Sequence, residues 1–150
     1  GTENLLGIAC LKAIADRWSD IRGQIEGLRP LRDRFERELI TRFPAVSITG
    51  QGSVRAPHLT HFRISGMPKD LSLVPQLDLR GFAVSSGSAC ASHVVEPSHV
   101  LLAMGLGRID ALNALRVSLH PGNRWEDLGQ FLGALEAILA RQNRGTAKAP

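Results

Sequence analysis

One cysteine of the chain, Cys90, stands in a segment composed only of small residues, from Ser85 to Ser92. A thiol becomes a nucleophile when it loses its proton, and a thiol that travels between two reaction partners needs a loop with little bulk. This segment suits that task, because it follows a short apolar run and precedes an expected helix. Composition alone leaves a second interpretation open, in which Cys90 is a partly buried small hydrophobic residue.

The other cysteine and the histidines are weaker candidates. Cys10 lies beside the apolar stripe of an expected helix, and we expect it to pack there. Cys90 and His93 have C-x-x-H spacing, but no second pair follows at zinc-site distance, so we predict no metal site. We expect the remaining histidines to be structural or exposed: His58, His61, His99 and His120.

Arg116 is the candidate for binding an anionic substrate. It lies in an expected strand, 114–119, in which Leu115, Val117 and Leu119 share one face, so Arg116 must point the other way. A planar guanidinium can donate two parallel charge-assisted hydrogen bonds to a carboxylate. The pattern is equally compatible with a surface arginine on an edge strand.

The elements that position these residues follow from hydrophobic periodicity. Apolar residues at three- and four-residue steps predict helices over 5–18 and 21–39, the second of which Pro30 should kink or divide near Gly27. Further patterns predict strands at 46–48, 60–64 and 82–84 and helices at 71–79, 97–104 and 126–141.

This mixture lacks strict alternation of strand and helix. It favours one α+β domain over residues 1–150, with a short sheet that has helices packed on one side and a loose tail at 143–150.

Composition narrows the classes of partner. The chain has 43% hydrophobic residues, no apolar run long enough for a bilayer and no leader sequence, so we expect a cytoplasmic protein without a membrane partner. The net charge of +4 comes from basic residues interleaved with acidic ones. Aromatic residues are only 5% of the chain and tyrosine is absent, so we expect no nucleic-acid partner.

Two sequence segments resemble the cysteine-loop region of the NifS/IscS-type cysteine desulfurases. Residues 85–90 read S-S-G-S-A-C, and residues 96–106 read E-P-S-H-V-L-L-A-M-G-L. Residues 116–119 resemble the family's R-F-S-L element, and residues 1–4 resemble the end of its R-S-G-T-E-N segment. The resemblance runs through nearly the whole chain and is to the carboxy-terminal portion of that family.

The resemblance implies the small carboxy-terminal domain of a fold-type I pyridoxal-phosphate enzyme, together with its leading helix. In that family a protein cysteine attacks the sulfur of L-cysteine held on pyridoxal phosphate, which gives L-alanine and a persulfide that passes to a sulfur-acceptor protein. By this resemblance Cys90 is the nucleophile and Arg116 binds the substrate carboxylate. Thr2 reaches the phosphate of the partner subunit's cofactor in a homodimer, or is a simple helix N-cap. The acceptor and the pathway, whether iron–sulfur cluster assembly, tRNA thiolation or another, stay open.

Two departures from the family matter. None of the lysines, Lys12, Lys69 and Lys148, lies in the His-Lys motif that anchors the cofactor, so we expect the pyridoxal-phosphate domain to be missing from these residues and the chain alone to be inactive. His120-Pro121-Gly122 stands where the family commonly has Gly followed by Arg. The alternatives are a non-catalytic persulfide carrier or scaffold-docking module, and a structural domain with an inert cysteine.

Overall fold

The computed structural model of the chain describes residues 1–67, 72–86 and 97–146, with residues 142–146 described by their backbone only. Its centre is a four-stranded antiparallel sheet, which confirms the predicted α+β class. The spatial order of the strands is β1-β2-β4-β3. Their bounds are Val46–Ile48 for β1, Leu59–Ile64 for β2, Ser85–Ser86 for β3 and Ala114–Ser118 for β4.

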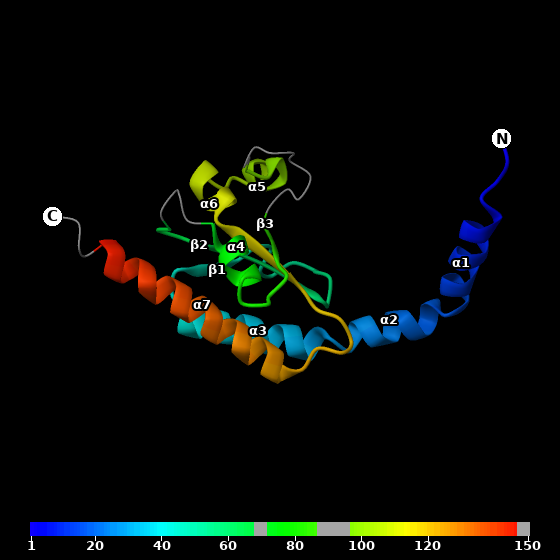
Figure 1. The fold of residues 1–150 in the computed structure, drawn as a ribbon, viewed down its shortest axis with the longest axis horizontal. Helices are drawn as coiled ribbons and strands as arrows, with labels where there is room; N and C mark the ends of the chain where they lie inside the picture. The colour runs from blue at the N-terminus through cyan, green and yellow to red at the C-terminus, as the bar shows by residue number, and fades with distance from the viewer. Residues whose placement is uncertain (68–71, 87–96, 147–150) are drawn as a thin grey trace.

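Three helices pack on one face of this sheet: α3 (Arg29–Arg42), α4 (Leu73–Asp78) and α7 (Trp125–Thr146). In Figure 1, α3 and α7 lie side by side beneath the strands. Phe131 on α7 is central to the core, because its ring meets those of Phe35 and Phe82 edge to face at 5.6 Å between centroids. Edge-to-face pairs add about 0.5–1.5 kcal/mol each to the burial of the rings.

Two short helices, α5 (His99–Ala103) and α6 (Arg108–Leu112), form a small second cluster. Leu101 and Ala111 pack there with Ala114 of β4, and all three are buried. The side chain of Ala114 lies on the opposite face of β4 from Leu115 and Val117, which belong to the main core. The sheet therefore has its main helical layer on one side, as expected, and two short helices at one end of the other side.

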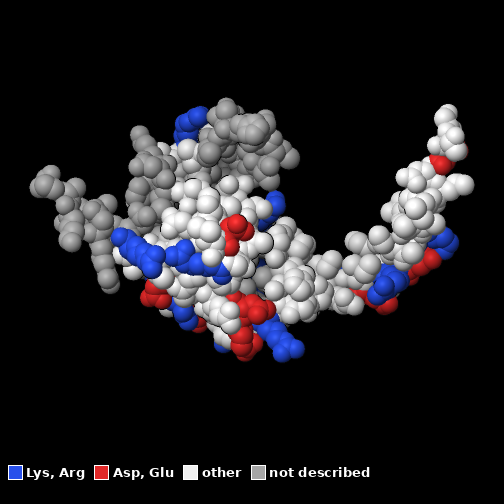
Figure 2. Space-filling view, in the orientation of Figure 1, with Lys and Arg blue, Asp and Glu red and all other residues white. Residues whose placement is uncertain are grey.

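The first two helices, α1 (Leu5–Asp16) and α2 (Trp18–Glu26), form an arm that projects from the body (Figure 1). Asn4 caps α1 by accepting the amide of Gly7 at 2.9 Å. Neither helix contains a buried residue. Figure 2 shows the arm as largely uncharged surface, with its charged side chains gathered along one edge.

Two prolines lie in the first turn of a helix, where the lack of an amide hydrogen costs no hydrogen bond. Pro30 lies in the first turn of α3, and the chain divides between α2 and α3 at Gly27 and Leu28, which confirms the predicted break. Pro75 also lies in the first turn of its helix, α4, where the absence of an amide hydrogen costs no bond.

Three details differ from the sequence-based expectations. The strand predicted at 82–84 is wrong, because the residues that pair with β4 are Ser85 and Ser86. The short helix α6 was not foreseen, since one turn of helix has too few residues to show a period. Helix α7 continues to Thr146, so residues 143–146 of the predicted tail are helical.

A partly buried ion pair joins α3 to the connection between β1 and β2. Arg55 donates two hydrogen bonds to the carboxylate of Glu36, at 2.6 and 2.8 Å, and Thr60 of β2 donates a third at 3.1 Å. Arg32 of α3 also donates to the carbonyl of Ala56 at 3.0 Å. The Glu36 carboxylate raises the pKa of the Arg55 guanidinium above its ordinary value, mainly through these hydrogen bonds.

In the part of the chain that the structure describes, no helix is long and apolar enough to cross a membrane.

Candidate functional site

Arg116 lies in the middle of β4 on the face of the sheet opposite the main core. Its neighbours Leu115 and Val117 are buried, whereas Arg116 is exposed, which confirms the orientation predicted from alternation. On one side Arg116 is paired with Ser85 of β3, and its Nη2 lies 3.4 Å from the Ser85 hydroxyl oxygen. On the other side it is paired with His61 of β2.

The same face of the sheet carries a second arginine, whose charge is paired with a carboxylate. Arg63, two residues after His61 on β2, donates to the carboxylate of Asp110 on α6 at 2.7 Å. Among residues 1–67, 72–86 and 97–141, no carboxylate forms an ion pair with Arg116. The guanidinium of Arg116 therefore presents its charge to this face of the sheet, where an anionic group could bind it.

His61 is a polar neighbour of Arg116 that the sequence did not single out. Its Nδ1 lies 2.8 Å from the Thr49 hydroxyl oxygen. Burial lowers the pKa of His61, and the positive charge of Arg116 lowers it further. The imidazole is therefore uncharged at neutral pH. Only the register of the sheet, which a single sequence does not give, shows that His61 and Arg116 are neighbours.

Cys90 and His93 lie outside the described residues, so the prediction that Cys90 is the nucleophile remains a prediction. The described strand nearest to it in the chain is β3, which ends at Ser86, four residues earlier. Four residues of fully extended chain span at most about 14 Å. Within β3, Ser85 is paired with Arg116 and Ser86 with Leu115, so the last described residues before the cysteine lie beside Arg116 in the sheet.

For two residues of the amino-terminal region, the structure differs from an expectation based on the sequence. Thr2 is exposed and precedes the first helix, whose N-cap is Asn4, so the interpretation of Thr2 as the cap is wrong. Cys10 is exposed on α1, so the prediction that it packs is wrong for this chain. The sequence showed an apolar stripe on α1 but not whether a partner surface within these residues covers it.

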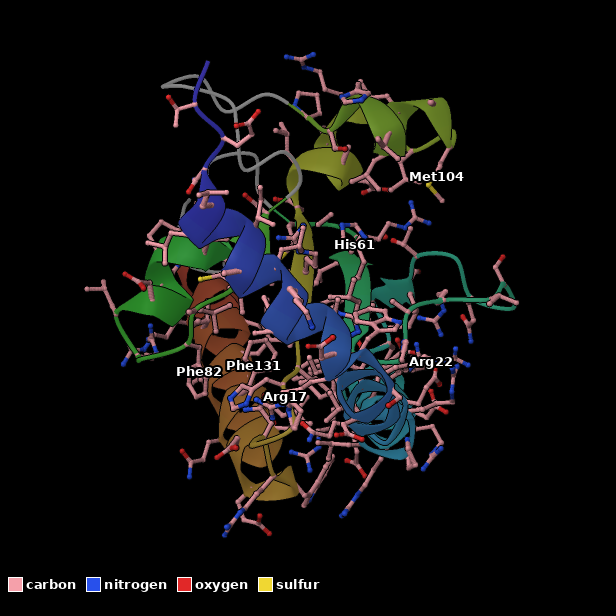
Figure 3. All side chains as sticks on the ribbon, turned by 90° about the vertical axis from the view of Figure 1, so that its right-hand side faces the viewer. Arg17, Arg22, His61, Phe82, Met104 and Phe131 are labelled. Atoms are coloured by element: carbon pink, nitrogen blue, oxygen red, sulfur yellow. The ribbon has the colours of Figure 1, made fainter. Side chains whose placement is uncertain are left out.

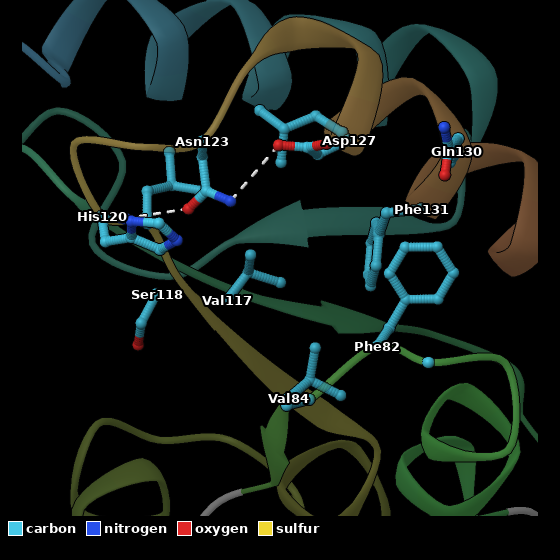
Figure 4. Close-up of a pocket in the computed structure, with 13 residues that line it drawn as sticks. Phe82, Val84, Val117, Ser118, His120, Asn123, Asp127, Gln130 and Phe131 are labelled. Carbon is cyan, nitrogen blue, oxygen red and sulfur yellow. Dashed lines mark hydrogen bonds between the residues drawn. The ribbon is translucent and has the colours of Figure 1, made fainter.

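A pocket of about 580 Å³ opens between the residues before β3, the end of β4 and α7 (Figure 4). Its walls include Phe82, Val84, Val117 and Phe131. At its rim, the amide of Gly122 donates to Nδ1 of His120 at 3.0 Å. An added Cβ at Gly122 would lie 2.7 Å from the ring of the exposed His120, so a side chain at this position would displace that ring. The departure at residues 120–122 therefore forms a compact turn that leads into α7.

Asp127 completes this turn from the first turn of α7. Its carboxylate accepts the amide of Arg124 at 2.9 Å and the side-chain amide of Asn123 at 3.5 Å, and the Asn123 side chain in turn accepts the amide of His120 at 2.9 Å (Figure 4). The backbone hydrogen bond from Arg124 is the main cause that lowers the pKa of Asp127 below its ordinary value. The polar groups at this rim thus bond one another and stabilise the start of α7.

Neither a metal centre nor a cofactor lysine emerges from the described residues. No group of three or more His, Cys, Asp or Glu side chains that could hold a metal ion occurs in that part of the chain. The one lysine within it, Lys12, pairs with Asp16 at 2.6 Å on the exposed surface of α1. Lys69 and Lys148 lie outside the described residues.

The sequence is similar to curated cysteine desulfurases along almost all of its length, although no family model matches it. A cysteine desulfurase of Sinorhizobium fredii is 35% identical over 142 residues, which make up 94% of this chain and 36% of that enzyme. The cysteine desulfurase IscS of Dictyoglomus turgidum is 38% identical over 142 residues, with the same coverage of both chains. The chain thus spans about a third of the length of these relatives.

Solved structures agree with this relationship. The X-ray structure of a NifS-like protein from Rickettsia africae superposes with a TM-score of 0.73 at 30% identity, over 93% of this chain and 36% of that one. A second NifS-like protein superposes with a TM-score of 0.67 at 25% identity. Both the sequence and the fold therefore relate this chain to the NifS/IscS-type cysteine desulfurases, of which it matches the carboxy-terminal portion.

Proposed function

We propose that the chain is the part of a cysteine desulfurase that supplies the nucleophile, Cys90, and the carboxylate-binding arginine, Arg116. One observation carries the proposal. Arg116 is exposed on the outer face of the sheet and is paired with β3, the strand that leads directly into the cysteine segment. The relatives that match 94% of the chain bear the name cysteine desulfurase, which supports this assignment.

In the proposed reaction, the guanidinium of Arg116 binds the carboxylate of L-cysteine and fixes the substrate beside the sheet. The Cys90 thiolate attacks the substrate's sulfur atom. A sulfur–sulfur bond forms, the substrate's carbon–sulfur bond breaks, and Cys90 keeps the sulfur as a persulfide. The released electron pair remains with the substrate carbon, which takes up a proton to give L-alanine. The persulfide sulfur then passes to the thiol of an acceptor protein.

The residues of this chain fit an accessory role toward pyridoxal phosphate but do not anchor it. None of the three lysines in the sequence follows a histidine, as the family's anchoring lysine does, so we propose that the anchoring lysine is not among these 150 residues. The exposed hydroxyl of Thr2 is free of any helix cap and suits a hydrogen bond to the cofactor phosphate of a second subunit in a homodimer. Pyridoxal phosphate, when bound, supplies the electron sink that makes the carbon–sulfur bond cleavable.

The test begins with the coding sequence upstream of Gly1. A His-Lys pair ahead of an Arg-Ser-Gly-Thr segment is expected there, and the protein that includes it should release L-alanine from L-cysteine. Cys90→Ala should abolish this release, whereas the matched variant Cys10→Ala should leave it unchanged. A coding sequence that starts at Gly1, or full activity in Cys90→Ala, would contradict the proposal.

A second candidate function is a persulfide carrier that has no catalysis of its own. This role needs only the thiol of Cys90 and no anchoring lysine, and the lysine within the described residues, Lys12, pairs with Asp16 on the surface of α1. Incubating the 150-residue chain with L-cysteine and a complete desulfurase that lacks its own loop cysteine tests this role. A persulfide that forms on Cys90 and is absent in Cys90→Ala supports the carrier role. A Cys90 that acquires no persulfide excludes the carrier role.

A further inference from the structure

Arg116 belongs to a polar row that crosses the whole sheet. Thr49, directly after β1, donates its amide to the carbonyl of His61 at 2.8 Å, so it continues the β1–β2 ladder by one residue. His61 is paired with Arg116, and Arg116 is paired with Ser85. The order Thr49, His61, Arg116, Ser85 therefore follows the four strands from one edge of the sheet to the other. Cross-strand neighbours of this kind have Cβ atoms about 4.5–5.5 Å apart.

The row faces away from the main core. The residues that flank His61 in β2, Thr60 and Phe62, are fully buried, and Leu115 and Val117 on either side of Arg116 are buried as well. In Figure 3, Phe82 and Phe131 lie against α7, whereas His61 lies nearer to α5 and α6. Thr49, His61 and Ser85 are half-buried and Arg116 is exposed, so Arg116 is the most accessible side chain of this polar row.

Thr49 fixes the ring of His61. A threonine hydroxyl that donates to Nδ1 leaves the imidazole proton on Nε2, and a neutral ring can lie beside a guanidinium without charge repulsion. The ring is the cross-strand neighbour of Arg116, so we expect it to limit the rotamers open to the long side chain of Arg116, which has Ser85 on its other side at 3.4 Å. Among the described residues, Arg116 on β4 is the charge that acts on His61, and Arg63, on the same strand as His61, is paired with Asp110 of α6.

We propose that His61, held by Thr49, is a positioning residue for Arg116 that fixes the guanidinium on the outer face of the sheet for a carboxylate. The identity of that carboxylate, the one of an amino-acid substrate, rests on the proposed function, whereas the positioning rests on the contacts of the row. The pairing of His61 with Arg116 also couples carboxylate binding at Arg116 to protonation of His61. A carboxylate that binds Arg116 cancels the charge that disfavours protonation of His61, so carboxylate binding and proton uptake by His61 favour each other.

Nuclear magnetic resonance on the 150-residue chain tests this directly. The Nε–H signal of Arg116 reports the order of its side chain, and the ring nitrogens of His61 report its tautomer and pKa. We expect an ordered Arg116 signal and an Nε2-protonated His61. Thr49→Val and His61→Ala should both reduce the order of Arg116, while the dispersion of the backbone amide signals shows that the fold is retained.

The charge coupling has a matched pair of variants. Arg116→Gln should raise the pKa of His61, whereas Arg63→Gln, which removes a charge that Asp110 already neutralises, should change it little. Sodium acetate should raise the pKa of His61 relative to sodium chloride at equal ionic strength, and this effect should vanish in Arg116→Gln. An Arg116 signal that is unchanged in both Thr49→Val and His61→Ala, or a pKa of His61 that does not respond to Arg116→Gln, would overturn the proposal. The experiment involves neither Cys90 nor a cofactor, so its failure is distinct from a failure of the desulfurase assignment.

Discussion

The two residues proposed to act on the substrate belong to neighbouring parts of the sequence pattern. Arg116 takes its place from the alternation of β4, in which each outward residue is flanked by buried ones. Cys90 follows β3, the strand paired with β4, by four residues in the sequence and lies outside the described residues. An arginine held by a strand suits a reaction in which the substrate is held still while sulfur moves.

Replacing Arg116 by alanine should mainly weaken the binding of L-cysteine. Loss of a charge-assisted hydrogen bond costs about 1.5–3 kcal/mol, so we expect kcat/KM of the complete enzyme to fall roughly 10- to 150-fold, mostly through KM. Arg63→Ala is the matched control, since it removes an arginine of the same face that is already paired with Asp110. Steady-state kinetics decide the matter, and an equal loss in both variants would reject the role of Arg116.

The sequence alone led to the outward orientation of Arg116, because a period of two is visible in the residues of one strand. It did not lead to His61, whose importance depends on the pairing of β2, which ends at Ile64, with β4, which begins only at Ala114. Pairing between distant strands is set by tertiary packing, so no local pattern shows it. The cysteine motif was recognisable from its residue types, while its conformation lies outside the described part of the chain.

Helix α3 is fastened to the sheet by the ion pair between Glu36 and Arg55. The Glu36 side chain is only 10% exposed, whereas Glu38, on the same helix, is 37% exposed and pairs with Arg42 at 3.0 Å. These two glutamates therefore form a matched set that differs in burial and in the number of hydrogen bonds. The comparison separates the contribution of a buried, bidentate pair from that of a solvent-screened one.

We expect Glu36→Gln to lower the free energy of unfolding by about 1.5–3 kcal/mol, because it removes the charge that Arg55 and Thr60 bind. Glu38→Gln should change that free energy by less than about 0.5 kcal/mol. Urea denaturation of the two variants measures both values. Similar values for the two substitutions would show that the buried pair does not fasten α3.

The start of α7 should make stability depend on pH. The pKa of Asp127 is lowered in the folded chain, chiefly by the hydrogen bond from the amide of Arg124, so its carboxylate stabilises the fold above its ordinary pKa of about 4. This stabilisation is lost as pH falls through the lower, folded-state pKa. Thermal unfolding between about pH 6 and pH 3 should therefore show a smaller loss of Tm in Asp127→Asn than in the wild type.

The control for this prediction is Glu126→Gln, which removes the neighbouring acid of the same turn. Among the described residues, Glu126 accepts none of the capping hydrogen bonds that Asp127 accepts. Its replacement should leave the pH dependence of Tm close to that of the wild type. An equal effect of both substitutions would assign the pH dependence to the general charge of the turn instead of the cap.

Across the whole molecule, the body and the arm differ in what holds them. The sheet and its three covering helices share one buried core, whereas α1 and α2 bury no residue. Large apolar side chains of α1 are more than half exposed, among them Leu5, Leu6 and Leu11. Isolated helices of about a dozen residues are marginal in water without tertiary packing. The apolar stripe could be read from the sequence, but the absence of a covering surface among the described residues could not.

Hydrogen exchange on the 150-residue chain should reflect this division. We expect the amides of α1 to exchange much faster than those of α3 and α7, whose buried faces stay closed until the core opens. The comparison should be made at low protein concentration, where contacts between copies are suppressed. Protection of α1 equal to that of α3 would contradict the expectation.

A single turnover is the most direct test of whether Cys90 accepts the substrate's sulfur. The complete enzyme is mixed with one equivalent of L-cysteine and no sulfur acceptor, thiols are alkylated, and peptides are weighed by mass spectrometry. We expect one extra sulfur atom on the Cys90 peptide, in an amount equal to the L-alanine released, and none on the Cys10 peptide. L-alanine formed while Cys90 remains an unmodified thiol would contradict it.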